Sequence, residues 1–145
     1  MINRDVQIQC LLYQVSQMRL VLQKRFRVPL KKTGLELNDF YSLTIIFEQN
    51  IKTASELSRQ LQFSPATVSV ILKKMLRKKL ISIAIDPNDG KQKIITVTEF
   101  GKKNWVRAKS ILSKIDHDLN LNFGMEIRQF RKFYHKFILE GKYEK

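Results

Sequence analysis

The segment from residue 53 to residue 78, TASELSRQLQFSPATVSVILKKMLRK, contains two helix start signals in close succession. Its first four residues have the spacing of a capping box, in which Thr53 and Glu56 each accept a hydrogen bond from the other's backbone N–H. Ser64 and Pro65 form the second signal, with serine as N-cap and proline at the first helical position. The segment therefore predicts two short helices separated by a tight turn.

The second of these helices, predicted to end at about Lys78, has two unlike faces. No acidic residue occurs between Leu57 and Ile85. Small residues allow the start of a helix to approach base edges in the major groove, and later cations reach the phosphate backbone. This order favours a helix-turn-helix. We expect Val68, Ile71, Leu72 and Met75 to face the core, and Ala66, Thr67, Ser69, Val70, Lys73, Lys74 and Arg77 to face outward.

The hydrophobic period then changes from that of a helix to that of a strand. Residues 81–86 alternate, as do residues 95–98, and the sequence Pro-Asn-Asp-Gly at 87–90 lies between them. This pattern predicts a β-hairpin with a polar tip. Lys91 and Lys93 place positive charge at the tip or just beyond it. A basic hairpin directly after a recognition helix is a wing, which lies along or in the adjacent minor groove.

Helical periodicity continues on both sides of this unit. The predicted helices are residues 5–26 with Pro29 after the end, residues 37–47, a helix capped by Thr98 and Glu99, and a last helix after Asn122. The apolar residues of the first and last helices exceed what one small winged domain can cover, which indicates a layer that pairs with a second copy. The predicted fold is mainly α with a small β-hairpin wing, as an N-terminal dimerisation helix (1–32), a winged helix-turn-helix domain (33–100) and C-terminal dimerisation helices (101–145).

Composition supports an anionic partner. The 145 residues include 27 Lys and Arg against 13 Asp and Glu, a formal net charge of +14, and 43% hydrophobic residues. Such a charge destabilises a compact state unless an anion neutralises it. A single cysteine excludes an intramolecular disulfide framework and a paired-cysteine zinc site. There is no signal-peptide pattern and no run of 18 apolar residues, so we expect a cytoplasmic protein that does not enter a membrane.

These residues resemble the MarR family of winged helix-turn-helix transcriptional regulators. The resemblance rests on residues 53–57, 64–69, 80–81, 86–91 and 96–101, in the family's order. It implies a homodimer that binds near-palindromic double-stranded DNA, usually as a repressor. Many members release DNA when they sense a small molecule or an oxidant, so a small-molecule effector is an implied partner, and no cofactor is implied.

Two positions depart from the family pattern. The family commonly has glycine just before the Leu80-Ile81 pair, where this chain has Lys79, and a left-handed conformation there costs a lysine roughly 1 kcal/mol. The family's wing usually has an Asp and an Arg two residues apart, where this chain has Asp89 and Lys91. Lysine suits a narrow groove less well than arginine. We therefore expect the wing to contribute affinity more than specificity.

The predicted DNA-binding residues fall into two groups. The group expected close to bases is Ser64, Ala66, Thr67, Ser69 and Lys73. The other residues are expected at phosphates or at the wing. Ser64 and Thr53 also have the capping roles given above. The complete set is Thr53, Ser55, Ser64, Ala66, Thr67, Ser69, Lys73, Lys74, Arg77, Asn88, Lys91 and Lys93.

Cys10 is a further candidate, as a redox sensor. Redox-sensing relatives carry a reactive cysteine four residues before a tyrosine, whereas Cys10 precedes Tyr13 by three, which turns the thiol by about 100°. The alternative is a small apolar residue. His117 and His135 stand alone, so we expect no metal site. No nucleophile–base set or Gly-rich phosphate loop is present, which predicts a protein that is not an enzyme.

Two rival functions remain open at this point. One is an architectural protein that coats nucleic acid without regard to sequence, and competition by scrambled DNA distinguishes it from a regulator. The other is a protein of the membrane surface, which would need a Lys/Arg-flanked amphipathic helix outside the core, and we find none.

Overall fold

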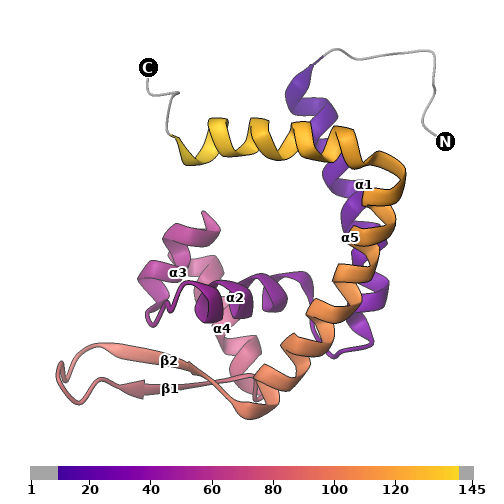
Figure 1. Ribbon diagram of the computed structural model, residues 1–145. Helices are drawn as coiled ribbons and strands as arrows, with labels where there is room; N and C mark the ends of the chain where they lie inside the picture. The colour runs from indigo at the N-terminus through magenta and orange to yellow at the C-terminus, as the bar shows by residue number, and fades with distance from the viewer. Residues whose placement is uncertain (1–9, 141–145) are drawn as a thin grey trace.

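The computed structural model describes residues 10–140. In chain order its elements are α1 (Leu11–Lys31), α2 (Leu37–Glu48), α3 (Ala54–Leu61), α4 (Pro65–Arg77), β1 (Ile81–Ile85), β2 (Lys93–Val97), α5 (Glu99–Tyr134) and a terminal π-helical turn, η1 (His135–Leu139). Figure 1 shows α2, α3, α4 and the hairpin as one group. Helix α1 and the first part of α5 run beside this group, and the end of α5 bends back above it. The predicted fold class, mainly helical with one hairpin wing, is confirmed.

The core lies where the three short helices meet the hairpin and α5. The fully buried side chains include Leu43 of α2, Leu57 of α3 and Met75 of α4. Leu80, just before β1, and Ala108 of α5 are buried beside them. The stripe predicted to face inward from α4 is buried at all four positions. The apolar spacing of the sequence therefore places α4 correctly in the fold.

Helix α1 extends further than the sequence predicted. We expected it to end before Pro29, but Pro29 lies in its last turn and the helix continues to Lys31. The last turn persists because Leu30 is buried and the Thr33 hydroxyl donates to the Leu30 carbonyl at 2.6 Å. Gly34, with a φ of +77°, ends the turn instead. The predicted start near residue 5 lies outside the described residues.

The hairpin is antiparallel, with Ile83 opposite Ile95 and Ile81 opposite Val97. The Ile95 N–H also donates to the Lys52 carbonyl at 2.8 Å, so the segment before α3 lies against β2. This contact fixes the start of α3 beside the base of the wing.

The sequence predicted that a separate helix begins after Asn122. The structure has a local interruption of α5 at this point, without a loop. Phe123 has non-helical dihedrals (φ −136°, ψ 33°), and the helix resumes at once. The side-chain amides of Asn120 and Asn122 donate to the carbonyls of Asp116 and Asp118, at 2.7 and 2.8 Å. Such side-chain bonds to the preceding turn compete with the backbone ladder and bend helices. The arm beyond Phe123 thereby turns away from the first half of α5 (Figure 1).

Helix α4 ends in a Schellman motif. The Leu80 N–H donates to the Met75 carbonyl at 3.0 Å, and the Lys79 N–H donates to the Leu76 carbonyl at 2.9 Å. Lys79 occupies the left-handed position, with a φ of 58°. The strained conformation expected for the lysine that replaces the family's glycine is therefore present.

The junction between the wing and α5 requires a glycine. Thr98 caps the helix by accepting from the Gly101 N–H at 3.0 Å, and its hydroxyl donates to the Lys79 carbonyl at 2.7 Å. A methyl group at position 101 would overlap the Leu80 carbonyl oxygen. The start of α5 and the start of β1 are therefore packed with no room for a side chain.

Gly101→Ala is expected to lower the free energy of unfolding by at least about 2 kcal/mol, because the overlapping atom belongs to the backbone and cannot rotate away. Gly124→Ala is the matched control, since a Cβ there meets no atom within 4 Å. Chemical denaturation of both variants measures the difference. Equal stability of the two variants would contradict this packing.

Candidate nucleic-acid interface

The outward face of α4 is open along its whole length. Among residues 10–140, no acidic side chain forms an ion pair with a cation of this face. The face is therefore a positively charged surface whose first turn carries only small side chains. Its members, all exposed, are Ala66, Thr67, Ser69, Val70, Lys73, Lys74 and Arg77, as predicted from the sequence.

The first turn of α4 is held by its cap. The Ser64 Oγ accepts from the Thr67 N–H at 3.1 Å and lies 2.8 Å from the Thr67 Oγ1. Ser64 is thus engaged in the cap that the sequence predicted, and Thr67 shares a hydroxyl–hydroxyl bond with it. Ser69 lies two residues after Thr67 and has no such bond among the described residues.

The last turn of α4 is fastened to α2. The Lys78 Nζ donates to the Asp39 Oδ2 at 2.6 Å and lies 3.6 Å from the Glu36 Oε1. Asp39 is only 2% exposed and also accepts from the Glu36 N–H at 2.9 Å, as part of the α2 capping box. Lys78 is one of the basic residues in the acid-free segment between Leu57 and Ile85, but its role here is structural. Its partner lies 39 residues away, so no local pattern could identify it.

The start of α3 has the predicted capping box. The Glu56 N–H donates to the Thr53 Oγ1 at 3.3 Å, and the Thr53 N–H donates to the Glu56 Oε2 at 3.1 Å. The pKa of Glu56 lies below its ordinary value because its carboxylate accepts from the Thr53 hydroxyl and from the backbone N–H groups of Lys52 and Thr53. Thr53 is half-buried in this cap, whereas Ser55 is exposed.

The tip of the wing is shaped by two aspartates. The Asp86 Oδ1 accepts from the Asn88 N–H at 2.9 Å, and the Asp89 Oδ1 accepts from the Lys91 N–H at 3.2 Å. Asn88, Lys91 and Lys93 are all exposed. Asp89 therefore orders the turn that carries Lys91, a role the sequence analysis did not assign to it.

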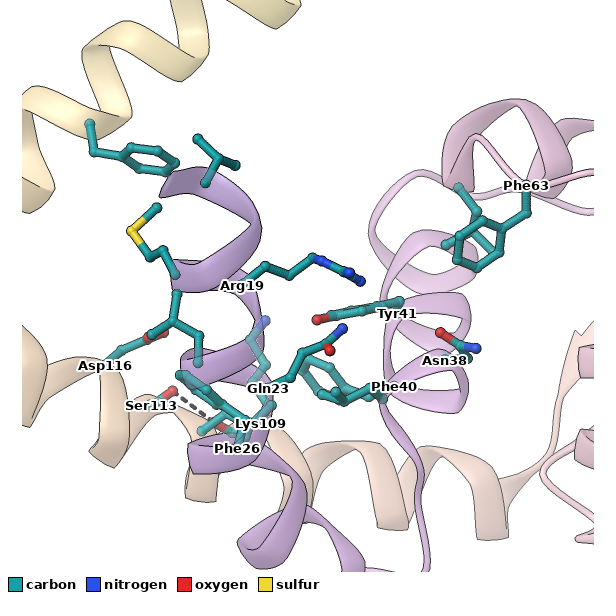
Figure 2. Close-up of a pocket in the computed structure, with 17 residues that line it drawn as sticks. Arg19, Gln23, Phe26, Asn38, Phe40, Tyr41, Phe63, Lys109, Ser113 and Asp116 are labelled. Atoms are coloured by element: carbon teal, nitrogen blue, oxygen red, sulfur yellow. Dashed lines mark hydrogen bonds between the residues drawn. The ribbon is translucent and has the colours of Figure 1, made fainter. Parts of the chain in front are cut away.

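A crevice separates the winged group from α1 and α5. It holds a cavity of about 830 Å³, mostly lined by apolar side chains. Figure 2 shows Arg19 and Gln23 extending from α1 toward Tyr41 on α2. Partial burial raises the pKa of the Tyr41 phenol above its ordinary value. The crevice therefore combines an apolar interior with three polar groups that converge.

The remaining predicted features lie apart from this surface. Cys10 is exposed at the start of α1, and its redox role stays a prediction. His135 lies 3.5 Å from the Glu140 carboxylate, and no three potential metal ligands gather anywhere between residues 10 and 140. Across the same residues, no helix has both the length and the apolar content that a bilayer crossing requires.

The capped helix pair, the open face of α4 and the hairpin that follows it define a winged helix-turn-helix protein. Residues 35–93 match the sequence model of the MarR family. This match extends from just before α2 to the start of β2, so it covers most of the winged helix-turn-helix unit. No curated protein matches the sequence.

Solved structures with similar folds are transcriptional regulators. The regulator PA4135 aligns with a TM-score of 0.79 and 19% identity, over 94% of this chain and 98% of its own. The S. aureus MepR–DNA complex aligns at 0.76 and 22%, over 91% and 96%. The organohalide-sensing regulator RdhR, bound to 2,4-dichlorophenol, aligns at 0.76 and 18%, over 93% and 83%. At these identities the likeness is one of fold.

The two neighbouring lysines Lys74 and Lys78 give a matched test of the assignments on α4. Lys78→Gln is expected to lower the free energy of unfolding by about 1–3 kcal/mol, because it leaves the Asp39 carboxylate buried without a cation. Lys74→Gln, at an exposed position with no ion pair to any residue from 10 to 140, should change the free energy of unfolding by less than about 0.5 kcal/mol. Urea denaturation distinguishes them, and equal small effects would show that Lys78 has no structural role.

Proposed function

We propose that the protein is a sequence-specific DNA-binding transcriptional regulator in which α4 is the recognition helix. The observation that carries the proposal is the exposed, acid-free face of α4, with small residues in its first turn and cations after them. Helix α4 enters the major groove, where Thr67 and Ser69 lie nearest the bases and Lys73 reaches their edges or the adjacent phosphates. The MepR–DNA complex, similar in fold, supports this docking.

The other predicted residues act at the backbone and the wing. Lys74 and Arg77 lie later on the same face of α4 and contact phosphates. Ser55, at the exposed start of α3, presents its hydroxyl to the DNA phosphate backbone, and Thr53 lies beside it. The wing lies along the minor groove and presents Asn88, Lys91 and Lys93 to it. The bond from the Lys91 N–H to the Asp89 carboxylate holds Lys91 at the tip. The resemblance to a family composed mostly of repressors favours repression. Binding, not catalysis, is the function proposed.

The protein acts as a homodimer in this proposal, through residues 1–32 and 101–145. Large apolar side chains of both helical segments lie open in a single chain, including Leu12 at 76%, Leu121 at 72% and Met125 at 62% exposure. Phe133 and Phe137 stack on the same arm, with ring centroids 5.4 Å apart. Exposed apolar surface of this extent favours burial against a second copy.

The crevice is the proposed site of a small-molecule effector, which would change the distance between the two recognition helices of the dimer. Its support is the apolar cavity beside Tyr41 and the bound 2,4-dichlorophenol of the RdhR regulator.

A compound that binds in this crevice should raise the melting temperature of the protein. Filling the cavity by Leu22→Trp should abolish that rise; an unchanged rise would place the compound elsewhere.

Selection from random-sequence duplexes tests the regulator function directly. The purified protein should enrich a near-palindromic sequence whose half-sites lie about one helical turn apart, because the dimer presents two recognition helices to successive major grooves. The selected duplex should bind about 10³-fold or more tightly than a scrambled one. Sequencing of the recovered fragments gives the pattern, and titration gives the ratio.

The alternative function, a sequence-blind architectural protein, predicts another result. No sequence would then be enriched, and selected and scrambled duplexes would bind alike at every salt concentration. That outcome would overturn the proposed regulator.

Met125→Glu tests the dimer. The substitution adds a charge at an exposed position, so it should leave the fold intact but prevent association if Met125 lies in the interface. Light scattering coupled to size exclusion should give about twice the chain mass of 17.1 kDa for the wild type and for Met125→Leu, and the single-chain mass for Met125→Glu. A monomeric wild type would contradict the proposed assembly.

A further inference from the structure

The net charge of the protein lies mostly outside the winged helix-turn-helix unit. Residues 33–100 contain nine basic and seven acidic side chains, a net charge of +2. The rest of the chain contains 18 basic and six acidic side chains, a net charge of +12. The surface already described therefore accounts for little of the excess positive charge, most of which lies on the helical layer.

The densest part of this excess is on α1. No acidic residue occurs between Asp5 and Glu36. The segment holds six basic residues, all exposed, and the ion pairs of residues 10–140 include none of them. Their mutual repulsion favours an anion bound to this helix. They are Arg19, Lys24, Arg25, Arg27, Lys31 and Lys32.

Three of these cations, Arg19, Arg27 and Lys31, lie on the side of α1 that faces α2, and Arg27 and Lys31 are the two nearest its C-terminal end. Arg27 and Lys31 are four residues apart, so they share one face of the helix. Both line a hollow of about 350 Å³, together with Glu36 and Asn38 at the start of α2. Figure 1 shows the end of α1 leading directly into this part of α2.

The same start of α2 borders the recognition helix. Glu36 and Asn38 also line a second hollow, of about 260 Å³, whose opposite wall includes Thr67, Val70 and Lys74 of α4. The two hollows share these two residues, so the start of α2 borders both the hollow that holds Arg27 and Lys31 and the hollow beside the outward face of α4. Two acids, Glu36 and Asp39, line this second hollow, and both face the Lys78 Nζ, at 3.6 Å and 2.6 Å.

We propose that Arg27 and Lys31 extend the DNA-binding surface beyond the winged helix-turn-helix unit, and that they contact backbone phosphates beside the major groove that α4 enters. This inference rests on the proposed function. Phosphate contacts depend on charge and position and carry no base preference. The two residues therefore add affinity and salt dependence, while the sequence preference remains with α4.

The test compares two double variants of α1. Arg27→Gln/Lys31→Gln removes the proposed contacts, and Lys24→Gln/Arg25→Gln is the matched control, with the same change of charge and composition on the same helix. Lys24 and Arg25 are exposed and line neither hollow. Both variants are titrated with the selected duplex and with a scrambled one over a range of salt concentrations, and circular dichroism verifies that both fold.

The log–log salt slope of the first variant should be smaller than that of the wild type by about 1–2, at about 0.9 per lost phosphate contact. Its affinity near 0.1 M salt should fall on the order of 10- to 100-fold, equally for both duplexes. The control should keep a slope close to that of the wild type.

Three outcomes decide the matter. An unchanged slope for Arg27→Gln/Lys31→Gln would overturn the inference, and so would an equal loss in the control, since the effect would then come from overall charge. A wild type that fails to prefer the selected duplex would instead overturn the proposed function. The two failures are therefore distinguishable in a single set of titrations.

Discussion

Four apolar side chains on one stripe of α4 hold this helix against the core, and the direction of its outward face depends on them. Val68, Ile71, Leu72 and Met75 are all buried, and burial of side chains of this size stabilises by roughly 1.5–3 kcal/mol each. Because successive residues are about 100° apart, fixing this stripe fixes the opposite one as well. A rotation by one position would bring Lys73 toward the core. The burial of the apolar stripe therefore also determines that the charged face of α4 is exposed.

Electrostatic interactions divide the basic residues of α4 between two roles. Lys78 neutralises the buried carboxylate of Asp39 and thereby ties the end of α4 to the first turn of α2. Lys73, Lys74 and Arg77 have no acidic partner among the described residues and face solvent. The first turn of α2 thus lies between the crevice on one side and α4 on the other. A displacement of this turn would act on α4 through this short ion pair, in which Asp39 is buried and Lys78 is partly exposed.

Local signals in the sequence predicted the elements that local physics determines. The caps at Thr53 and Ser64, the inward stripe of α4 and the wing all form as expected, because each depends on residues a few positions apart. Long-range features could not be predicted in this way. The Asp39–Lys78 pair joins residues 39 apart, and the burial of Leu30 carried α1 past Pro29. The cavity beside Tyr41 likewise arises only when four helices, α1, α2, α3 and α5, are brought together.

Chemical protection of guanine N7 in the selected duplex tests the central claim most directly, because this atom lies in the major groove and is read by a helix docked there. If the outward face of α4 is the reading surface, dimethyl sulfate should leave guanines unmodified in two windows about one helical turn apart. Both windows should become reactive when Ser69 and Lys73 are replaced by alanine. Full methylation of every guanine in the bound wild-type complex would contradict the account, since the duplex would then be held without entry of α4 into its major groove.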